Sequence, residues 1–402
     1  MLKKLLFFIL LLALCTLFYG CGLHSDSDNP TLDIHENAVY DGKLDNTTNP
    51  VGNDEAFIFT WLTYSELCVT SELKNKEDYQ KHIEGYFDSM REIGVTDCFV
   101  QVRPFADAMY ESEIFPLSQY AVNADGFDVL ETVIAVADKY GVGVHAWVNP
   151  YRISTKPLDE NSVWFKEYKD SVMVLDSGVY LNPTDVEAQR LILSGVQELL
   201  GNYDVEGIHI DDYFYPEDIG DADDGWYEAY KKSGGKKDLA SWRRENVNSL
   251  VSAMYLKVKS FGDHKIFSVS PTGNIDKNYT QLYADIYSWC KGGYCDMILP
   301  QIYFGFENSA LPFEECLDRW LSITDTDKVK LVPGLALYKC GKEDMFAGDG
   351  KDEWLINSDI IKRQVECLRD KGCQGFSLYS SSYINFSETF TGNELNNLKS
   401  VL

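Results

Sequence analysis

Residues 203–216 read YDVEGIHIDDYFYP, an apolar segment that runs directly into two carboxylates and an aromatic cluster. Carboxylates after a buried strand are costly unless they are paired or used in chemistry. Two close acids also raise the pKa of one of them, which keeps that acid protonated near neutral pH. Neighbouring residues of a strand point to opposite faces, so we expect Asp211, which shares the face of His209, to point inward. Bracing of loops by Asp211 and Asp212 is the alternative.

The pattern of a short apolar segment, a polar loop and a longer amphipathic stretch recurs along the chain. Strands are predicted at 57–61, 98–103, 143–149, 207–211, 266–270, 297–303, 331–337 and 375–379. Helices are predicted at 76–93, 129–140, 185–203, 239–259, 283–291, 313–323 and 357–371. Eight alternations predict an α/β fold, a (β/α)8 TIM barrel, whose active site gathers where the strands end. A doubly wound sheet is the alternative, although no glycine-rich phosphate loop follows the first strand.

Composition limits the class of protein and its partners. Of 402 residues, 45% are hydrophobic and 13% aromatic, which is enough to bury a large core. The chain carries 36 Lys and Arg against 63 Asp and Glu, a net charge of −27 at pH 7. Nucleic acid is therefore excluded as a partner, because its phosphates would be repelled. We expect one catalytic barrel domain over residues 56–385 and a C-terminal tail, 386–402, that packs on it.

The N-terminus resembles an export signal. Two lysines precede an apolar run over residues 5–19, as in a secretory signal peptide. The run ends in Gly20-Cys21, similar to a bacterial lipoprotein cleavage site, so residues 1–20 are predicted to be the signal and Cys21 the lipidated residue. Ordinary cleavage that leaves Cys21 as a thiol is the alternative. The polar residues 21–55 predict a flexible tether. We expect an exported protein that is held at the cell membrane or cell surface only through its lipid.

Eight further cysteines follow the signal and Cys21, and none of them forms a CxxC pair. Neither a zinc ribbon nor a redox motif is therefore indicated. Disulfides are compatible with export, and buried free thiols are equally compatible with a chain of this length.

Polar residues end the second predicted strand. Alternation places Gln101 and Arg103 on one face, where the guanidinium fork suits a carboxylate or sugar hydroxyls. Asp107 lies beyond the strand end and either overhangs the site or caps the next turn. An arginine that bridges acidic loops is the alternative for Arg103.

The third predicted strand ends in HAWVNPYR, residues 145–152. His145, Trp147 and Asn149 share a face, and Trp147 with Tyr151 suits a stacking wall for a pyranose ring, followed by Arg152. A hydrogen-bonded histidine and a packed tryptophan inside a barrel, with no ligand, are the alternative.

The sixth predicted strand places Gln301 and Tyr303 at its end, with Glu307 as a candidate second carboxylate. A catalytic metal held by His145, His209 and Asp211 is not expected, because such barrel sites also take histidines from the first strand, which has none. No other cofactor is indicated. The chain has no GxSxG motif, which disfavours acyl transfer.

Taken in order, these motifs resemble the glycosyl hydrolase-like 10 family of bacterial envelope barrels. The matching runs are 101–110, 141–152, 181–183, 203–216, 242–248, 268–273 and 300–303. The resemblance implies a (β/α)8 barrel, glycosidase activity and an envelope polysaccharide substrate, with peptidoglycan glycan strands as the leading candidate.

We therefore expect a glycoside hydrolase that cleaves O-glycosidic bonds by carboxylate acid/base chemistry, with Asp211 and Asp212 as the catalytic pair. Asp107 or Glu307 is the candidate distant partner of this pair. The residues expected to hold the sugar are Gln101, Arg103, Asp107, His145, Trp147, Asn149, Tyr151, Arg152, Tyr213, Gln301 and Tyr303. A non-catalytic carbohydrate-binding surface lipoprotein is the alternative. The oligomeric state stays open.

Overall fold

The computed structural model describes residues 57–402. The predicted signal peptide, the lipidation site Cys21 and the tether lie outside these residues. Within the described part of the chain, no helix is both long and apolar enough to cross a membrane.

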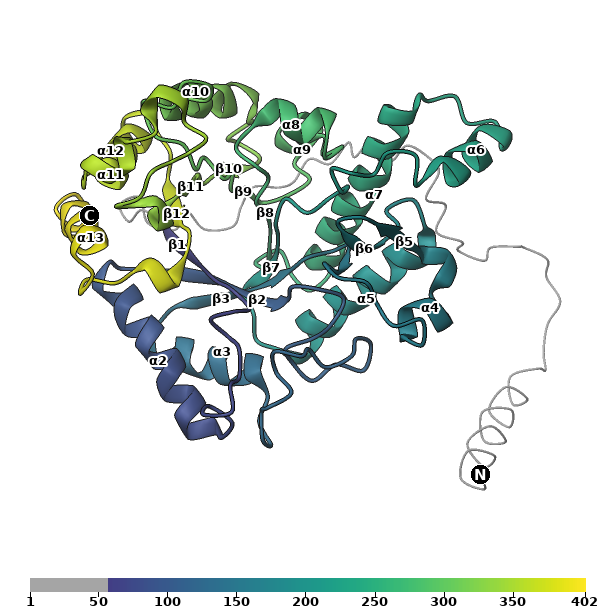
Figure 1. The fold of residues 1–402 in the computed structure, drawn as a ribbon, viewed down its shortest axis with the longest axis horizontal. Coiled ribbons are helices and arrows are strands. Elements are labelled where there is room, and N and C mark those ends of the chain that lie inside the picture. The colour runs from purple at the N-terminus through teal and green to yellow at the C-terminus, as the bar shows by residue number, and fades with distance from the viewer. Residues whose placement is uncertain (1–56) are drawn as a thin grey trace, which may run out of the picture. The chain divides into compact units, whose positions relative to one another are not determined.

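A parallel sheet forms the centre of the fold (Figure 1). Its strands follow the spatial order β10-β9-β8-β7-β3-β2-β1-β12-β11. They are β1 (Phe57–Leu62), β2 (Asp97–Arg103), β3 (Gly143–Val148), β7 (Gly207–Ile210), β8 (Ile266–Val269), β9 (Met297–Ile298), β10 (Lys330–Leu331), β11 (Gly334–Leu335) and β12 (Gly375–Leu378).

The sheet closes on itself through one interrupted strand. β10 and β11 stand at opposite ends of the spatial order, yet only Val332 and Pro333 separate them in the chain. The Val332 N–H donates to the Ile298 carbonyl at 3.0 Å, and the Ser377 N–H donates to the Pro333 carbonyl at 2.9 Å. Pro333 has no N–H to add to a ladder, which explains the break. The predicted (β/α)8 barrel is confirmed, with its seventh strand in two parts.

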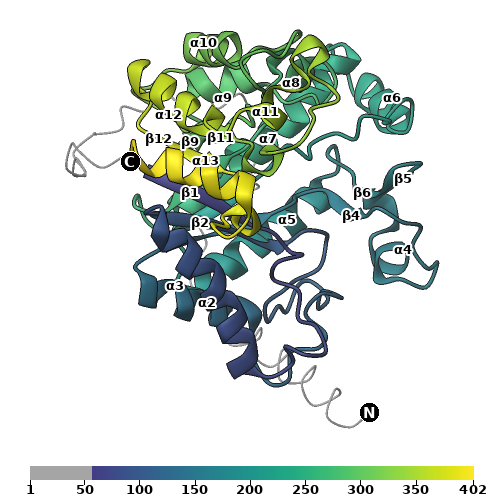
Figure 2. The ribbon, with the colours of Figure 1, turned by 60° about the vertical axis from the view of Figure 1, so that its left-hand side comes forward.

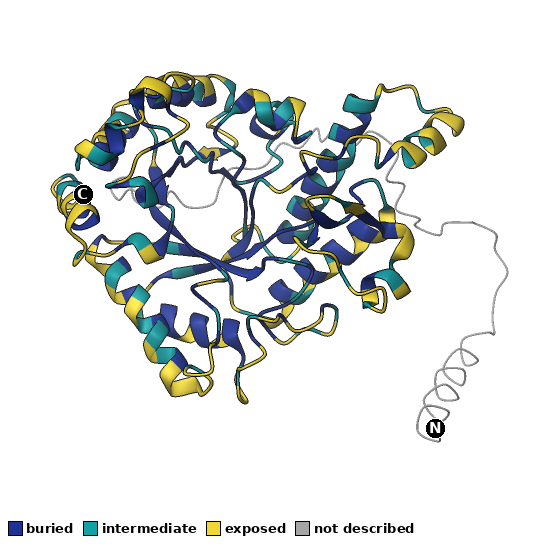
Figure 3. Cartoon of the chain, in the orientation of Figure 1, coloured by how far each residue is buried: buried dark blue, intermediate teal, exposed yellow. Residues whose placement is uncertain are grey.

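Helices surround the barrel, with exposed outer faces and inner faces buried against the strands (Figure 3). Several begin at an acidic or amide cap, as when Asp128 accepts from the Glu131 N–H and Asp185 from the Ala188 N–H. The helices are α2 (Lys76–Glu92), α3 (Val129–Tyr140), α4 (Val163–Glu167), α5 (Val186–Asn202), α6 (Asp224–Lys232), α7 (Leu239–Lys259), α8 (Ile275–Thr280), α9 (Ile286–Gly292), α10 (Phe313–Ile323), α11 (Glu353–Ile356), α12 (Ile360–Asp370) and α13 (Thr389–Lys399).

A small antiparallel sheet interrupts the repeat between β3 and α5. It contains β4 (Arg152–Ser154), β5 (Val172–Leu175) and β6 (Gly178–Leu181), in the order β4-β6-β5. Figure 2 shows this sheet, with α4 beside it, at the flank of the barrel. The sequence pattern predicted no elements here.

Aromatic and apolar side chains fill the barrel interior. They include Phe59, Trp61, Phe99, Trp147, Met297, Leu299 and Val332. The buried His209 lies among them and stacks on Phe99 with ring centroids 4.0 Å apart. The Trp61 Nε1–H donates to His209 Nε2 at 3.0 Å, and Nδ1 lies 2.8 Å from Ser268 Oγ. Burial lowers the pKa of His209, so this residue is a neutral core group.

The last helix, α13, lies against α12. Glu394 accepts from the Ile361 N–H at 2.5 Å, and Leu395 and Leu398 are buried. An ion pair of 2.9 Å between Lys399 and Glu92 joins α13 to α2. The eight cysteines among the described residues are all free thiols.

Candidate active site at the carboxyl ends of the strands

Asp211 directly follows β7 and is only 3% exposed. Its Oδ2 accepts from Trp147 Nε1 at 3.1 Å and from Asn149 Nδ2 at 2.5 Å. The Tyr213 N–H lies 3.5 Å from Oδ1. Side-chain donors therefore hold one carboxylate oxygen, and the other accepts only the long hydrogen bond from the Tyr213 N–H.

Burial raises the pKa of Asp211 to about 7, and the charge of Asp212 adds to this shift. Burial also raises the pKa of Asp212, whereas a hydrogen bond from Gln301 lowers it. Because the two carboxyls interact, they titrate as a pair. Near neutral pH the pair therefore keeps a proton that ordinary aspartates would have lost.

This raised pKa predicts how stability depends on pH. The folded protein keeps a proton at Asp211 up to about pH 7, whereas the unfolded chain releases it near the ordinary value of 3.8. The free energy of unfolding should therefore fall by a few kcal/mol as the pH rises from about 4 to about 7. Urea unfolding across this range measures the slope.

A second carboxyl contributes a slope of the same sign, because burial raises the pKa of Glu394 to about 7. Asp211→Asn and Glu394→Gln should each remove part of the slope, and the double variant should remove more of it than either single variant. A slope that both single variants leave unchanged would contradict this assignment.

Gln101 and Asn149 form a relay of hydrogen bonds behind Asp211. The buried Gln101 donates from Nε2 to Asn149 Oδ1 at 2.7 Å and accepts from the Tyr64 N–H at 3.1 Å. The relay fixes the Asn149 amide so that its NH2 group faces Asp211. Gln101 therefore acts on Asp211 through Asn149.

Arg152 and Tyr213 lie beside the carboxylate pair. The Arg152 guanidinium lies 4.9 Å from the centre of the Phe105 ring and 4.1 Å from that of Tyr213, and its charge opposes the rise in the pKa of Asp211. Tyr213 is 46% exposed although it is large and aromatic. A sugar ring can reach this side chain.

Three tyrosines line the neighbouring strand ends. Tyr303 lies 5.8 Å from Tyr338 and 5.7 Å from Tyr379, between ring centroids. Burial raises the pKa of Tyr303 well above its usual value, with smaller contributions from its tyrosine neighbours and from Asp212 and Asp211. Tyr338 and Tyr379 were absent from the predicted site. Tyr338 follows a predicted strand and Tyr379 ends one, and a position at a strand end is the signal that identified Tyr303.

Arg103 does not reach this cluster, so the prediction that it shares a face with Gln101 is wrong. The pairing of β2 with β3 shifts register between Gln101 and Arg103, and the shift turns Arg103 outward. Its guanidinium lies 4.5 Å from the Phe115 ring centre, and it packs against Gly195 of α5. The Arg103 side chain is therefore buried between the sheet and α5.

The predicted stacking wall is also wrong. Trp147 is 5% exposed and Tyr151 fully buried, so neither offers a ring face to a ligand. Trp147 instead presents its N–H to Asp211. His145 lies deeper in the barrel, with Nε2 3.3 Å from Asp97 Oδ1 and its ring against Phe99. His145, Trp147 and Asn149 thus lie at different depths, and only Asn149 lies beyond the carboxyl end of β3.

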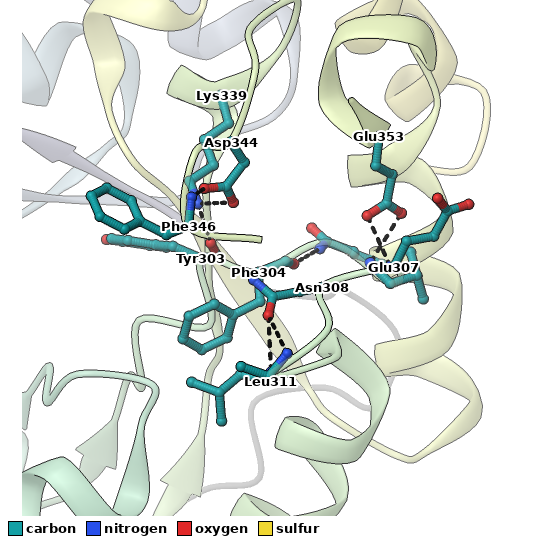
Figure 4. A network of polar contacts seen from close by, with 12 residues as sticks. Tyr303, Phe304, Glu307, Asn308, Leu311, Lys339, Asp344, Phe346 and Glu353 are labelled. Atoms are coloured by element: carbon teal, nitrogen blue, oxygen red, sulfur yellow. Dashed lines mark hydrogen bonds and ion pairs between the residues drawn. The ribbon is translucent and has the colours of Figure 1, made fainter. Parts of the chain in front are cut away.

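The candidate distant carboxylates are not joined to the pair. Asp107 has a pKa raised by burial and hydrogen-bonds Ser118 in the loop after β2. Glu307 has an exposed side chain, and Figure 4 shows it pointing away from Tyr303. Gln301, in contrast, does lie at the site: its Nε2 donates to the Ser270 carbonyl at 3.0 Å, and it hydrogen-bonds Asp212. Among the described residues, no group of three or more His, Cys, Asp or Glu is arranged to hold a metal ion.

Known proteins share both the sequence and the fold. A family model described as glycosyl hydrolase-like 10 matches residues 60–349. The chain is 32% identical over 333 residues to "Glycosyl hydrolase YngK" of Bacillus subtilis, covering 76% of this chain and 64% of that protein. It therefore spans slightly less than two thirds of that relative. It is 30% identical over 366 residues to "Glycosyl hydrolase DigH" of Escherichia coli, covering 82% of each.

Solved structures support the fold alone, because their sequence identities are low. The glycoside hydrolase domain of PgaB (BpsB) from Bordetella bronchiseptica superposes with a TM-score of 0.56 at 13% identity, over 87% of this chain and 99% of that one. Alpha-L-fucosidase isoenzyme 2 from Paenibacillus thiaminolyticus gives a TM-score of 0.53 at 13% identity, over 86% and 49%. The family match covers most of the barrel and its strand-end cluster, and the resemblance expected from the sequence motifs is confirmed: the chain belongs to the glycosyl hydrolase-like 10 family.

Proposed function

We propose that this protein is a glycoside hydrolase that cleaves O-glycosidic bonds in peptidoglycan glycan strands of the bacterial envelope. The observation that carries the proposal is the proton-retaining pair Asp211–Asp212 at the carboxyl end of β7, next to the exposed ring of Tyr213. Glycosidic cleavage needs an acid that is protonated at working pH and a carboxylate beside it.

In the proposed mechanism the pair works as one acid and base. Asp212 is less buried than Asp211 and faces the substrate, and Asp211 behind it supplies the shared proton. The proton passes to the glycosidic oxygen as the bond to the anomeric carbon breaks. Water then adds to that carbon and returns a proton to the pair. Tyr213 and Arg152 hold the sugar over the carboxylates.

The N–H of Trp147 gives this mechanism a test. Trp147→Phe keeps an aromatic ring but removes the donor 3.1 Å from Asp211 Oδ2. Loss of a hydrogen bond to the ionised form raises the pKa of the pair further. The alkaline limb of the pH profile of kcat should therefore move to higher pH, with kcat at its optimum lowered about tenfold. An unmoved limb would mean that Asp211 does not set it.

We further propose that the protein is exported and held at the membrane by a lipid on Cys21. The basis is the charged start, the apolar run and the Gly20-Cys21 junction. Labelling of intact cells with a radioactive fatty acid should mark the wild type and leave Cys21→Ser unlabelled.

A non-catalytic carbohydrate-binding role is the second candidate. Asp211 is almost wholly buried and receives two side-chain donors, as a purely structural carboxylate would. A binder would keep its affinity for glycan in Asp211→Asn and would release no reducing ends even as wild type.

Release of reducing ends from purified peptidoglycan, with and without peptide stems, separates these two functions. The protein used should lack residues 1–21. Release that disappears in Asp211→Asn supports the hydrolase. Binding without release supports the second candidate.

A further inference from the structure

Phe346 is the most exposed large apolar side chain in the described part of the chain, at 93%. It lies in the loop between β11 and α11, on the same side of the barrel as the Asp211–Asp212 pair, because that loop follows the carboxyl end of a barrel strand. A single exposed apolar side chain is common on protein surfaces, so the question is whether the structure holds this ring in its exposed position.

A buried ion pair keeps this loop in place. Lys339 Nζ lies 2.6 Å from Asp344 Oδ2 and donates to the Tyr303 carbonyl at 2.7 Å. The other oxygen of Asp344 accepts from the Phe346 N–H at 3.2 Å. The backbone that carries Phe346 is thereby tied to Tyr303, in the segment that follows β9.

Further contacts lock the same loop to residues 303–311 (Figure 4). The Ser309 N–H donates to the Ala347 carbonyl at 3.0 Å. Glu353 accepts from the N–H groups of Phe306 and Glu307 at 3.0 Å each. Because these contacts fix the loop to residues 303–311, the loop conformation itself holds the Phe346 ring in its exposed position.

The contact of Lys339 with Tyr303 also connects the loop of Phe346 to the active site. Tyr303 packs with Tyr379, and the charges of Asp211 and Asp212 act on its phenol. In Figure 4 the rings of Tyr303 and Phe346 extend to the same side of the Lys339–Asp344 pair. The loop of Phe346 is thus tied to Tyr303, whose phenol feels the charges of the carboxylate pair.

We propose that Phe346 is the stacking platform of a distal sugar subsite, which binds a pyranose unit of the glycan strand away from the bond that is cleaved. This inference rests on the proposed function, because it assigns a polymeric glycan as the substrate of the Asp211–Asp212 pair. The negative face of the ring matches the weakly positive C–H groups of a sugar, and the fixed loop removes the entropy cost of ordering it.

Kinetics with two substrate lengths test the subsite. Phe346→Ala should raise KM for long, stem-free glycan strands by roughly fivefold to tenfold relative to KM for a tetrasaccharide fragment, with kcat for long strands retained. Phe346→Tyr should restore the wild-type ratio. Met345→Ala, at a neighbouring side chain that is 72% exposed but not aromatic, is the matched control and should change neither constant.

Binding without turnover supplies an independent measurement. Phe346→Trp combined with Asp211→Asn places a reporter indole at the subsite of an inactive enzyme. Stem-free strands should shift its emission to shorter wavelength, in difference spectra against Asp211→Asn alone.

The outcomes separate the subsite from the activity. If the wild type releases no reducing ends but the indole responds to strands, the hydrolase assignment fails and the subsite stands. If strands are cleaved while Phe346→Ala keeps the wild-type KM ratio and the indole stays silent, the subsite is refuted.

Discussion

Replacing Asp211 by Asn should lower kcat for glycan hydrolysis by about a thousandfold or more and leave the fold intact. An amide keeps an oxygen for the N–H groups of Trp147 and Asn149, so the two side-chain hydrogen bonds at this position survive. It has no proton to share with Asp212, and acid–base groups of this kind contribute roughly 10²–10⁴ in rate. Reducing-end release at saturating substrate measures the loss, and circular dichroism checks the fold.

Glu307→Gln is the matched control for this substitution. It makes the same kind of change, acid to amide, at an exposed carboxylate in the loop after β9, outside the cluster. Its kcat should stay within about twofold of wild type. Equal activity in both variants and wild type would remove Asp211 from the chemistry, and a large loss in Glu307→Gln would return that residue to the site.

Replacing Arg243 by Met should destabilise the protein by roughly 3–5 kcal/mol, because it leaves the carboxylate of Asp223 buried and unpaired. The two side chains are 3% and 0% exposed. Arg243 Nε donates to Asp223 at 2.9 Å, and its terminal nitrogens donate to the Gly220 carbonyl and the Tyr283 hydroxyl at 2.8 Å each. This arginine of α7 thus anchors the loop that follows Asp211 and Asp212.

Arg319→Met provides the comparison for the Arg243 variant. Its ion pair with Asp276 measures 2.9 Å, but the side chains are 44% and 69% exposed, so its loss should cost about 1 kcal/mol or less. Urea unfolding at one pH compares the two variants. Because only Arg243 anchors the catalytic loop, its variant should also lose activity at temperatures where it is still folded. Equal stability losses in the two variants would contradict the anchoring role.

The positions of the barrel strands could be predicted because each is a short apolar segment bounded by polar loops. In the folded protein the apolar segments form the buried strands and the polar segments form the loops. The break in the seventh strand was not predicted from the sequence. Its cause is Pro333, whose missing N–H interrupts the ladder without ending the extended segment. The small sheet of β4, β5 and β6 was not predicted, because these strands are short and lie in a polar insertion. They do not belong to the alternation of strands and helices from which the barrel strands were predicted.

The part of the site that could be predicted is the part formed by residues at the ends of predicted strands. Asp211, Asp212, Asn149 and Gln301 were found from their places at those ends. Alternation does not reveal depth, however, so His145 and Trp147 appeared equivalent to Asn149 although they lie progressively deeper in the barrel. A sequence also does not show a shift in strand register. The shift in the pairing of β2 with β3 turns the Arg103 side chain away from the barrel interior.

The way the barrel closes also determines when the chain can become folded. β1 pairs with β12, and the Thr60 hydroxyl bonds the Leu378 carbonyl 318 residues further along the chain. Until the last strand has been synthesised, β1 keeps an open edge, and contacts between such distant segments form slowly. For a protein that we propose is exported, this late closure is an advantage: the ring cannot form before nearly all of the chain exists, so a chain still being synthesised has not reached the closed fold that a translocation channel would exclude.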